Sequence, residues 1–179
     1  MAHFFTANTH FHDAMIINML GRPYRSVEEH DAALTAAAIR DLARNDDLWI
    51  LGNFAAPAGG IDPSRLAWTL ARLPGRKRLV AGPQDGPEIR KLDWYSIHEM
   101  VEIQDGDARF FLCHYPLAAW NGQRAGVRHL YGHVHRGMPG SATTLNVGVD
   151  EIGVAPIGRE AILARMAELG RTEVEAEVA

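Results

Sequence analysis

The sequence predicts an α/β fold, a two-sheet mixed α/β/β/α sandwich with flanking helices. In the first half of the chain, helical segments lead into short apolar strands, and each strand ends in a polar cluster. This alternation is typical of an α/β sheet. In the second half, strands follow one another directly, with a hairpin signal at Asp105 and Gly106. No linker divides the chain, so we expect a single domain over residues 1–179, with a frayed acidic end at 171–179.

Short apolar runs predict three buried strands in the first half, at residues 3–7, 48–51 and 78–81. Helical segments are expected at residues 16–20, 26–44 and 62–73. Ser26 and Glu29 form a capping box, and Asp62 with Pro63 makes a second helix start. Because ligands gather at the carboxyl ends of strands in open α/β sheets, we expect the functional site there.

The second half predicts strands at residues 97–103, 109–114, 127–131 and 143–147, and a final helix at 159–169. A turn is expected near Pro139 and Gly140. The single cysteine, Cys113, excludes an intramolecular disulfide and is expected to be a buried small hydrophobe.

Composition excludes several classes of protein. The 179 residues carry a net charge of −4 without a long basic run, which argues against a nucleic-acid-binding patch. No apolar run is long enough for a membrane span, and the first residues do not form a signal peptide. We therefore expect a cytoplasmic protein with no membrane partner, and the sequence leaves its oligomeric state open.

His133 and His135 stand where a predicted strand ends, directly after Gly132. Residues two apart on an extended strand point to the same side, so both imidazoles can address one metal ion or two neighbouring ions. Further polar residues also fall at the ends of apolar runs: Asn8, His10, Asn53, Asp85 and His114. Together they make a candidate metal site.

Six segments in this order resemble the motifs of the calcineurin-like metallophosphoesterases, in particular the small bacterial and phage members. They are residues 5–11, 51–54, 82–85, 114–117, 131–135 and 145–150. The resemblance runs from about residue 4 to residue 160. It implies a two-sheet α/β sandwich that hydrolyses phosphate esters with two divalent cations.

The resemblance also implies a ligand set. One metal would be held at positions 8, 10, 53 and 135, and the other at positions 53, 83, 114 and 133. A carboxylate at position 53 would bridge the two ions, and the histidine that the family has at position 84 would assist the leaving group. Two cations of this kind clamp the attacking and leaving oxygens and lower the pKa of bound water.

This chain keeps the four histidines but not the acids. Asn8 and Asn53 stand where the family has aspartates, and Pro83 and Gln84 stand where it has Asn-His. A carboxamide is neutral and bridges two metals poorly, so two ions would bring roughly +4 of charge without an anionic ligand. Proline offers no side-chain ligand, and Gln84 cannot carry a proton as histidine does.

Close relatives also more often have histidine and asparagine at the positions of Asp13 and Met15. We therefore expect at most one divalent metal, Zn²⁺, Ni²⁺ or Mn²⁺, or none. Histidines without carboxylates suit Zn²⁺, Ni²⁺ or Cu²⁺ better than Mg²⁺ or Mn²⁺.

Three functions remain open. The first is a family member with an inactive or strongly impaired two-metal site, which could still bind a phosphate ester, another oxyanion or a protein partner. The second is a phosphomonoester or phosphodiester hydrolase that uses one histidine-bound metal. The third is a scaffold whose histidines are structural, with Asn8 and Asn53 closing a neutral polar network around the imidazoles.

Other residues receive secondary assignments. His12 and Arg136 are expected to contact the substrate, while Asp85 and Gln84 are the catalytic candidates, Asp85 through orientation. Trp120 either rims the site or packs in the core. The remaining histidines are expected to be surface or half-buried: His3, His30, His98 and His129.

Overall fold

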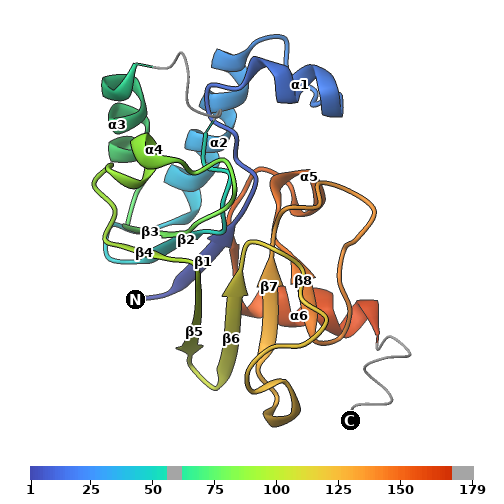
Figure 1. The fold of residues 1–179 in the computed structure, drawn as a ribbon. Helices are drawn as coiled ribbons and strands as arrows, with labels where there is room; N and C mark the ends of the chain where they lie inside the picture. The colour runs from blue at the N-terminus through green and yellow to red at the C-terminus, as the bar shows by residue number, and fades with distance from the viewer. Residues whose placement is uncertain (56–61, 171–179) are drawn as a thin grey trace.

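The computed structural model describes residues 1–55 and 62–170, and in this part the chain folds into two sheets that pack face to face (Figure 1). The predicted α/β fold with two mixed sheets is confirmed. The expected frayed end, residues 171–179, lies outside the described part. No helix of the described part is long and apolar enough to cross a bilayer.

The first sheet has the strand order β4-β3-β2-β1-β9. Its strands are β1 (His3–Thr6), β2 (Asp47–Ile50), β3 (Arg76–Val80), β4 (Ser96–His98) and β9 (Ile157–Gly158). All pairs are parallel except β1 with β9. The first three strands match the three predicted in the first half, whereas β9 is too short to leave a periodic signal in the sequence.

The second sheet has the order β5-β6-β7-β8. Its strands are β5 (Met100–Asp105), β6 (Ala108–Cys113), β7 (Arg128–Tyr131) and β8 (Thr144–Asn146). The expected hairpin joins β5 to β6, with Gly106 at φ 62°, and the other pairs are parallel. The single strand predicted at 97–103 is wrong: it divides at Glu99 into β4 and β5, which belong to different sheets. The apolar pattern continues through this point, so it does not reveal the change of partner.

Helices cover one face of the first sheet. They are α2 (Val27–Asp41), α3 (Pro63–Arg72) and α4 (Pro87–Arg90). Helix α1 (Ala14–Leu20) lies beyond the strand ends (Figure 1). Ser26 and Asp62 cap α2 and α3 as predicted, each accepting a hydrogen bond from a backbone N–H of its helix. Later in the chain come η1 (Gln123–Ala125), α5 (Val149–Ile152) and α6 (Arg159–Leu169).

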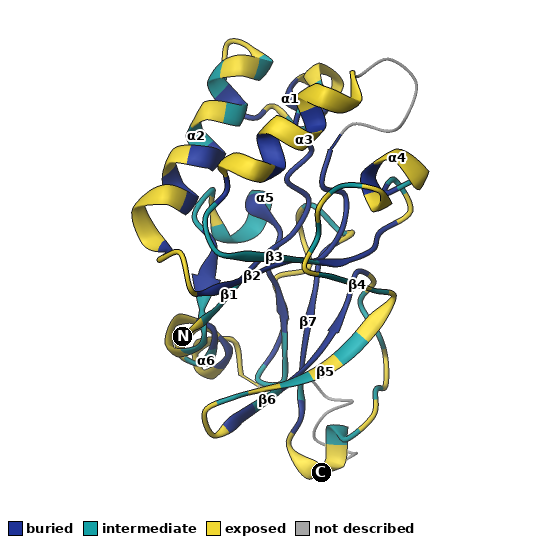
Figure 2. Cartoon of the chain, turned by 90° about the vertical axis from the view of Figure 1, so that its left-hand side faces the viewer, coloured by how far each residue is buried: buried dark blue, intermediate teal, exposed yellow. Residues whose placement is uncertain are grey.

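Alternation along the strands divides the core into two layers. Leu48 and Ile50 pack with apolar residues of α2 and α3, whereas Trp49 and Leu51 pack against the second sheet. Figure 2 shows the buried strands between the exposed outer faces of the helices and the partly exposed β5. Ile162 and Met166 of α6 are buried in the inter-sheet layer, and α6 contacts β8 and β9.

Part of the outer face of the second sheet is covered by the segment between β6 and β7. Trp120 belongs to this cover: its Nε1–H donates to the Val127 carbonyl over 2.7 Å, and its ring packs against buried Cys113 and Phe111. Trp120 is therefore a packing residue rather than a rim of the site. Cys113 is buried as predicted.

Two histidines expected at the surface are fully buried. His129 is 0 % exposed; its Nδ1–H donates to the Phe111 carbonyl, and its Nε2 accepts from the Leu117 N–H. His30 is 1 % exposed and is bonded to Arg22 and Asp31. The expectation of surface or half-buried positions was wrong for both, because polar partners inside the fold satisfy the ring nitrogens.

Truncating the inter-sheet core should destabilise the protein. Leu112 of β6 is 0 % exposed among apolar side chains of both sheets. For Leu112→Ala we expect the free energy of unfolding to fall by about 2–5 kcal/mol in urea denaturation. The control is Met100→Ala on the neighbouring strand, 57 % exposed, which should change it by less than about 0.5 kcal/mol. Equal effects would contradict the described packing.

Candidate functional site

The candidate residues follow the carboxyl ends of β1, β2, β3, β6 and β7, as expected for an α/β sheet. In Figure 1 the arrows of β6, β7 and β8 point to the end of the molecule where α1 and α5 lie. In residues 1–55 and 62–170, five non-glycine residues have positive φ: Asn8, His10, His12, Asn53 and His133. Such conformations cost of order 1–3 kcal/mol each and cluster at functional sites. All five lie in these strand-end loops.

The loop after β1 is fastened to the loop after β2. The Asn8 N–H donates to the Gly52 carbonyl over 2.9 Å, and the His10 N–H donates to the Asn53 carbonyl over 3.0 Å. Asp13 then caps α1, accepting at Oδ1 from the backbone N–H of Met15. The backbone of residues 8–13 is thereby held at one end by the loop after β2 and at the other end by the start of α1.

Asp85 fastens the loops after β2 and β3. Its Oδ2 accepts from the Asn53 N–H over 3.0 Å and the Gly82 N–H over 2.8 Å, and its Oδ1 accepts from the Phe54 N–H over 2.8 Å. Burial raises the pKa of this carboxyl despite the three backbone donors that favour its ionised form. Both carboxylate oxygens of Asp85 are therefore occupied by backbone N–H groups, and through these bonds Asp85 positions Asn53.

The turn after β7 presents His133 and His135. The Val134 N–H donates to the Gly132 carbonyl over 2.7 Å, which makes a tight three-residue turn centred on His133 at φ 61°. Buried Asn146 donates to the Val134 carbonyl over 2.5 Å. The turn is thus held from β8.

The histidine cluster, which consists of His10, His114, His133 and His135, forms two pairs. The rings of His10 and His135 have centroids 5.3 Å apart, and those of His114 and His133 are 5.2 Å apart. These are the pairs that the family resemblance assigns to two separate metals. Within the described residues, however, no group of three His, Cys, Asp or Glu side chains is placed to hold an ion.

Three of the four rings have an acceptor at Nδ1. His114 donates from Nδ1 to the Leu51 carbonyl over 2.8 Å. His10 lies 3.1 Å from Oδ2 of Asp13 through its Nδ1, and His135 lies 2.8 Å from Oδ2 of Asp150. An Nδ1–H bond to a carbonyl or carboxylate leaves the lone pair on Nε2, the atom that binds a metal.

The buried rings are neutral near pH 7. Burial, assisted by the charge of Arg22, lowers the pKa of His10 to about 4, and burial likewise lowers the pKa of His114 to about 4. Burial alone would raise the pKa of Asp150, but His135 and Arg22 outweigh it and hold the pKa of that carboxyl at about 2. A neutral imidazole whose Nδ1–H is bonded to an acceptor keeps on Nε2 the lone pair that binds a cation.

Several buried polar atoms of the site have no partner. They are Asn8 Oδ1, Asn8 Nδ2, His10 Nε2, His114 Nε2 and Gln84 Oε1. The closed neutral network between Asn8 and the imidazoles that a structural role would require is therefore not formed, and that expectation was wrong. Unpaired buried groups cost about 1–3 kcal/mol each, so this set is a candidate site for solvent or a ligand.

Asn53 differs from Asn8 because its Oδ1 accepts from the Gln84 N–H over 3.3 Å. The space around it is tight: a Cβ added at Gly82 would lie 2.8 Å from Asn53 Oδ1 and 2.9 Å from His114 Cε1. A side chain at Gly82 would therefore displace both residues.

The two predicted substrate contacts lie in different settings. Arg136 follows His135 directly in the sequence and is exposed to solvent. Its role as a substrate contact remains a prediction. The His12 ring lies 3.0 Å from Asp31 and 2.7 Å from Thr69 Oγ1, in a groove of about 250 Å³ between α2 and α3. The Nε2 atom of His12 is thus hydrogen-bonded to Thr69, whereas its buried Nδ1 lies close to Asp31 without a hydrogen bond.

Three residues of the site were missed in the sequence. Asp13 and Asp150 are the carboxylates behind His10 and His135, and Arg22 binds Asp150 through two parallel hydrogen bonds of 2.9 and 2.7 Å. Asp150 lies in a quoted motif, but its partner is 128 residues away. No periodicity or spacing reveals a pair so distant in sequence.

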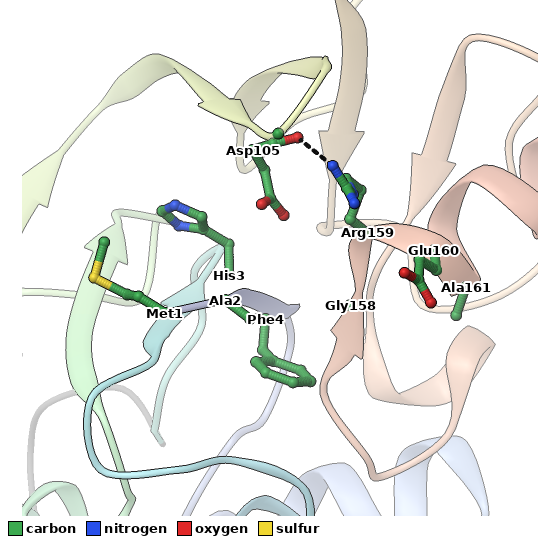
Figure 3. A pocket seen from close by; sticks show the side chains of 10 residues that line it. Met1, Ala2, His3, Phe4, Asp105, Gly158, Arg159, Glu160 and Ala161 are labelled. Carbon is green, nitrogen blue, oxygen red and sulfur yellow. Dashed lines mark hydrogen bonds between the residues drawn. The ribbon is translucent and has the colours of Figure 1, made fainter.

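A cavity of about 620 Å³ lies at the opposite end of β1, against the start of α6 (Figure 3). Two of its polar side chains, those of His3 and Arg159, are already paired. His3 Nδ1 accepts from Trp49 Nε1 over 2.9 Å, and Arg159 donates to the Asp105 carbonyl over 3.2 Å and to Asp107. In residues 1–55 and 62–170, most of the buried side-chain atoms without a partner lie instead at or beside the histidine cluster, the exceptions being Thr6 Oγ1 and His12 Nδ1.

The fold and site define an α/β protein with two packed sheets and a histidine cluster at the strand ends. No family model matches the chain. It is similar to the Gene 66 protein of Mycobacterium phage L5, with 28% identity and coverage of 71% of this chain and 76% of that protein. The Gene 66 protein of Mycobacterium phage D29 is 26% identical over 152 residues, 68% of this chain and 76% of that protein.

Among solved structures, AQ665 of Aquifex aeolicus, a protein of unknown function, overlays with a TM-score of 0.73. The overlay covers 90% of this chain and 97% of that chain at 22% identity, which shows a shared fold. Yfce, a phosphoesterase from E. coli, overlays over 83% of this chain and 78% of that chain at 17% identity. Its TM-score of 0.46 is too low to establish a common fold.

The metal-free protein should lose stability as the pH falls from about 6.5 to about 4. The folded-state pKa values of His10 and His114 lie below the ordinary 6.5, so the unfolded chain takes up protons first. Each should lower the free energy of unfolding by up to roughly 3 kcal/mol across this window. Urea denaturation with a chelator at several pH values measures the slope, and His10→Gln/His114→Gln should flatten it. An unchanged slope would refute the described burial.

Proposed function

We propose that this chain is a relative of the calcineurin-like phosphoesterases whose histidine cluster binds one divalent metal, such as Zn²⁺, and with it an oxyanion, while two-metal hydrolysis is lost or strongly impaired. One observation carries the proposal. His10 is buried with Nδ1 bonded to Asp13 and with no partner at Nε2, and its ring lies 5.3 Å from that of His135, whose Nδ1 is bonded to Asp150. Structural histidines satisfy both ring nitrogens, as His129 does.

The residues present fit a histidine-bound ion but do not fit a carboxylate-bridged pair of ions. Neutral Asn53 stands at the bridging position, and its Oδ1 already accepts from the Gln84 N–H. Two divalent ions only a few ångströms apart repel strongly unless an anionic ligand lies between them. A single bound ion would supply Lewis acidity toward a phosphoryl oxygen.

The His10–His135 pair is the better of the two places for an ion. Both of its rings have a carboxylate at Nδ1, Asp13 and Asp150, which raises the basicity of the imidazoles and adds negative charge nearby. In the other pair, the described residues supply one such acceptor, the neutral carbonyl of Leu51 at Nδ1 of His114. Electrostatics therefore favours the first pair for a cation.

The asparagine side chain at position 8 suits an oxyanion beside the ion. Both its oxygen and its nitrogen are buried without a partner. A carboxamide can face a cation with Oδ1 and donate from Nδ2 to an anionic oxygen, whereas a carboxylate can only accept. The exchange of aspartate for asparagine thus favours retention of a phosphate or phosphate ester rather than its hydrolysis.

Metal analysis tests the proposed site directly. After incubation with Zn²⁺ and desalting, the parent protein should retain at most about one equivalent. His10→Ala/His135→Ala should abolish retention, while the matched variant His114→Ala/His133→Ala should keep most of it, because the carboxylates support only the first pair. Two tightly retained equivalents, or equal loss in the two variants, would show that this assignment of the ion is wrong.

Hydrolysis tests the loss of the acids. The parent protein should give negligible turnover of an aryl phosphodiester with Mn²⁺ or Zn²⁺ present. The quadruple variant Asn8→Asp, Asn53→Asp, Pro83→Asn, Gln84→His should bind a second ion and gain activity, because it supplies the bridging carboxylate. If the variant folds yet binds no additional metal, the geometry of the strand-end loops has diverged as well.

A further inference from the structure

Arg22 is buried beneath the histidine cluster, and each of its five N–H groups has an acceptor. Its side chain is 4 % exposed. The acceptors are Asp150 Oδ1 at 2.9 Å, Asp150 Oδ2 at 2.7 Å, the Asn8 carbonyl at 2.8 Å, the Thr9 carbonyl at 3.2 Å and His30 Nε2 at 2.8 Å. A fully satisfied guanidinium is a rigid five-point connector.

The end of α1 aims this side chain inward. Gly21 has φ 59°, the Gly21 N–H donates to the Asn18 carbonyl, and the Arg22 N–H donates to the Ile17 carbonyl over 2.9 Å. These two bonds form the glycine-terminated helix end in which the chain reverses sharply. Pro23 follows and prevents the helix from continuing.

Two of the contacts hold the strained loop of the first motif. Arg22 binds the carbonyls of Asn8 and Thr9, and Asn8 and His10 both have positive φ. Because such backbone is unfavourable by itself, it persists only when its surroundings fix it. Arg22 supplies part of this constraint from inside the molecule.

The other principal contact is the parallel pair of bonds to Asp150. The same Oδ2 that accepts from Arg22 lies 2.8 Å from Nδ1 of His135. Arg22 therefore fixes the carboxylate that in turn fixes the orientation and the tautomer of His135.

We propose that Arg22 is a positioning residue of the histidine cluster: it holds the loop that bears His10 and, through Asp150, sets His135 in the tautomer that offers Nε2 to a ligand. This inference rests on the proposed function only for its consequence, tighter metal binding. The positioning itself concerns the protein without metal.

The chain contains a second arginine–aspartate contact for comparison. Arg76 makes the same two-bond contact with buried Asp47, at 2.8 Å for each bond, at the opposite end of the first sheet. Its side chain is more exposed than that of Arg22, and Asp47 also binds Arg78. If Arg22 formed only a structural ion pair, Arg22→Met and Arg76→Met would both lower the melting temperature. The two variants would then also have the same effect on the tautomer and metal affinity of the histidine cluster.

The first experiment uses metal-free protein. Long-range ¹H–¹⁵N NMR spectra report which ring nitrogen of His135 carries the proton. The parent and Arg76→Met should show the single Nδ1–H form, Arg22→Met should lose it, and Arg22→Lys should recover it in part, since a lysine keeps the charge but lacks the fork. If Arg22→Met is folded and keeps the single Nδ1–H form, the proposal fails whether or not the protein binds metal.

The second experiment measures the Zn²⁺ dissociation constant by competition with a chelator, at a temperature at which circular dichroism shows every variant to be folded. Arg22→Met should weaken binding by about tenfold or more, the usual effect of removing a group that orients a metal ligand, and Arg76→Met by less than twofold. Equal weakening in both variants overturns the proposal. If Arg22→Met does not fold, Arg22→Lys against Arg76→Lys decides by the same two criteria.

If the parent protein binds no Zn²⁺, the proposed function fails while the NMR result still decides the role of Arg22. Conversely, a parent that binds Zn²⁺ together with an unchanged His135 tautomer in Arg22→Met leaves the metal site standing and removes the positioning role. The two failures are therefore distinguishable.

Discussion

The hydrogen bond at Nδ1 of each buried imidazole is the interaction on which the site depends. A neutral histidine has one ring proton, and whichever acceptor takes it decides which nitrogen keeps its lone pair. The acceptors for His10, His114 and His135 come from the cap of α1, the end of β2 and the start of α5. The chemistry of the cluster is thus set by the packing of three loops around it.

The distribution of charge is what makes the proposed single ion compatible with a set of ligands that lacks carboxylates. The acids expected in direct contact with metal are neutral here, as Asn8 and Asn53, while Asp13 and Asp150 stand one imidazole further out. Negative charge at that distance stabilises one ion through the polarised rings. It does not lie between two ions, so it cannot offset their mutual repulsion.

Much of the fold could be predicted from the sequence, because the strands and helices have clear periodicity and Ser26 and Asp62 mark helix starts. The order of motifs placed the histidines at the strand ends, where the structure has them. Pairwise contacts between distant residues could not be predicted. Arg22 with Asp150 and the buried partners of His129 depend on tertiary packing, which leaves no local pattern.

The passage of the chain from β4 to β5 at Glu99 has a consequence for how the molecule opens. A single residue joins the edge strand of the first sheet to the edge strand of the second, so the two sheets share one nearly continuous extended segment. If the edge strand of one sheet separates from its neighbour, the connected edge strand of the other sheet is displaced as well. Amide hydrogens of β2 and β7, deep in different sheets, should therefore exchange with solvent through one common global opening rather than two independent ones.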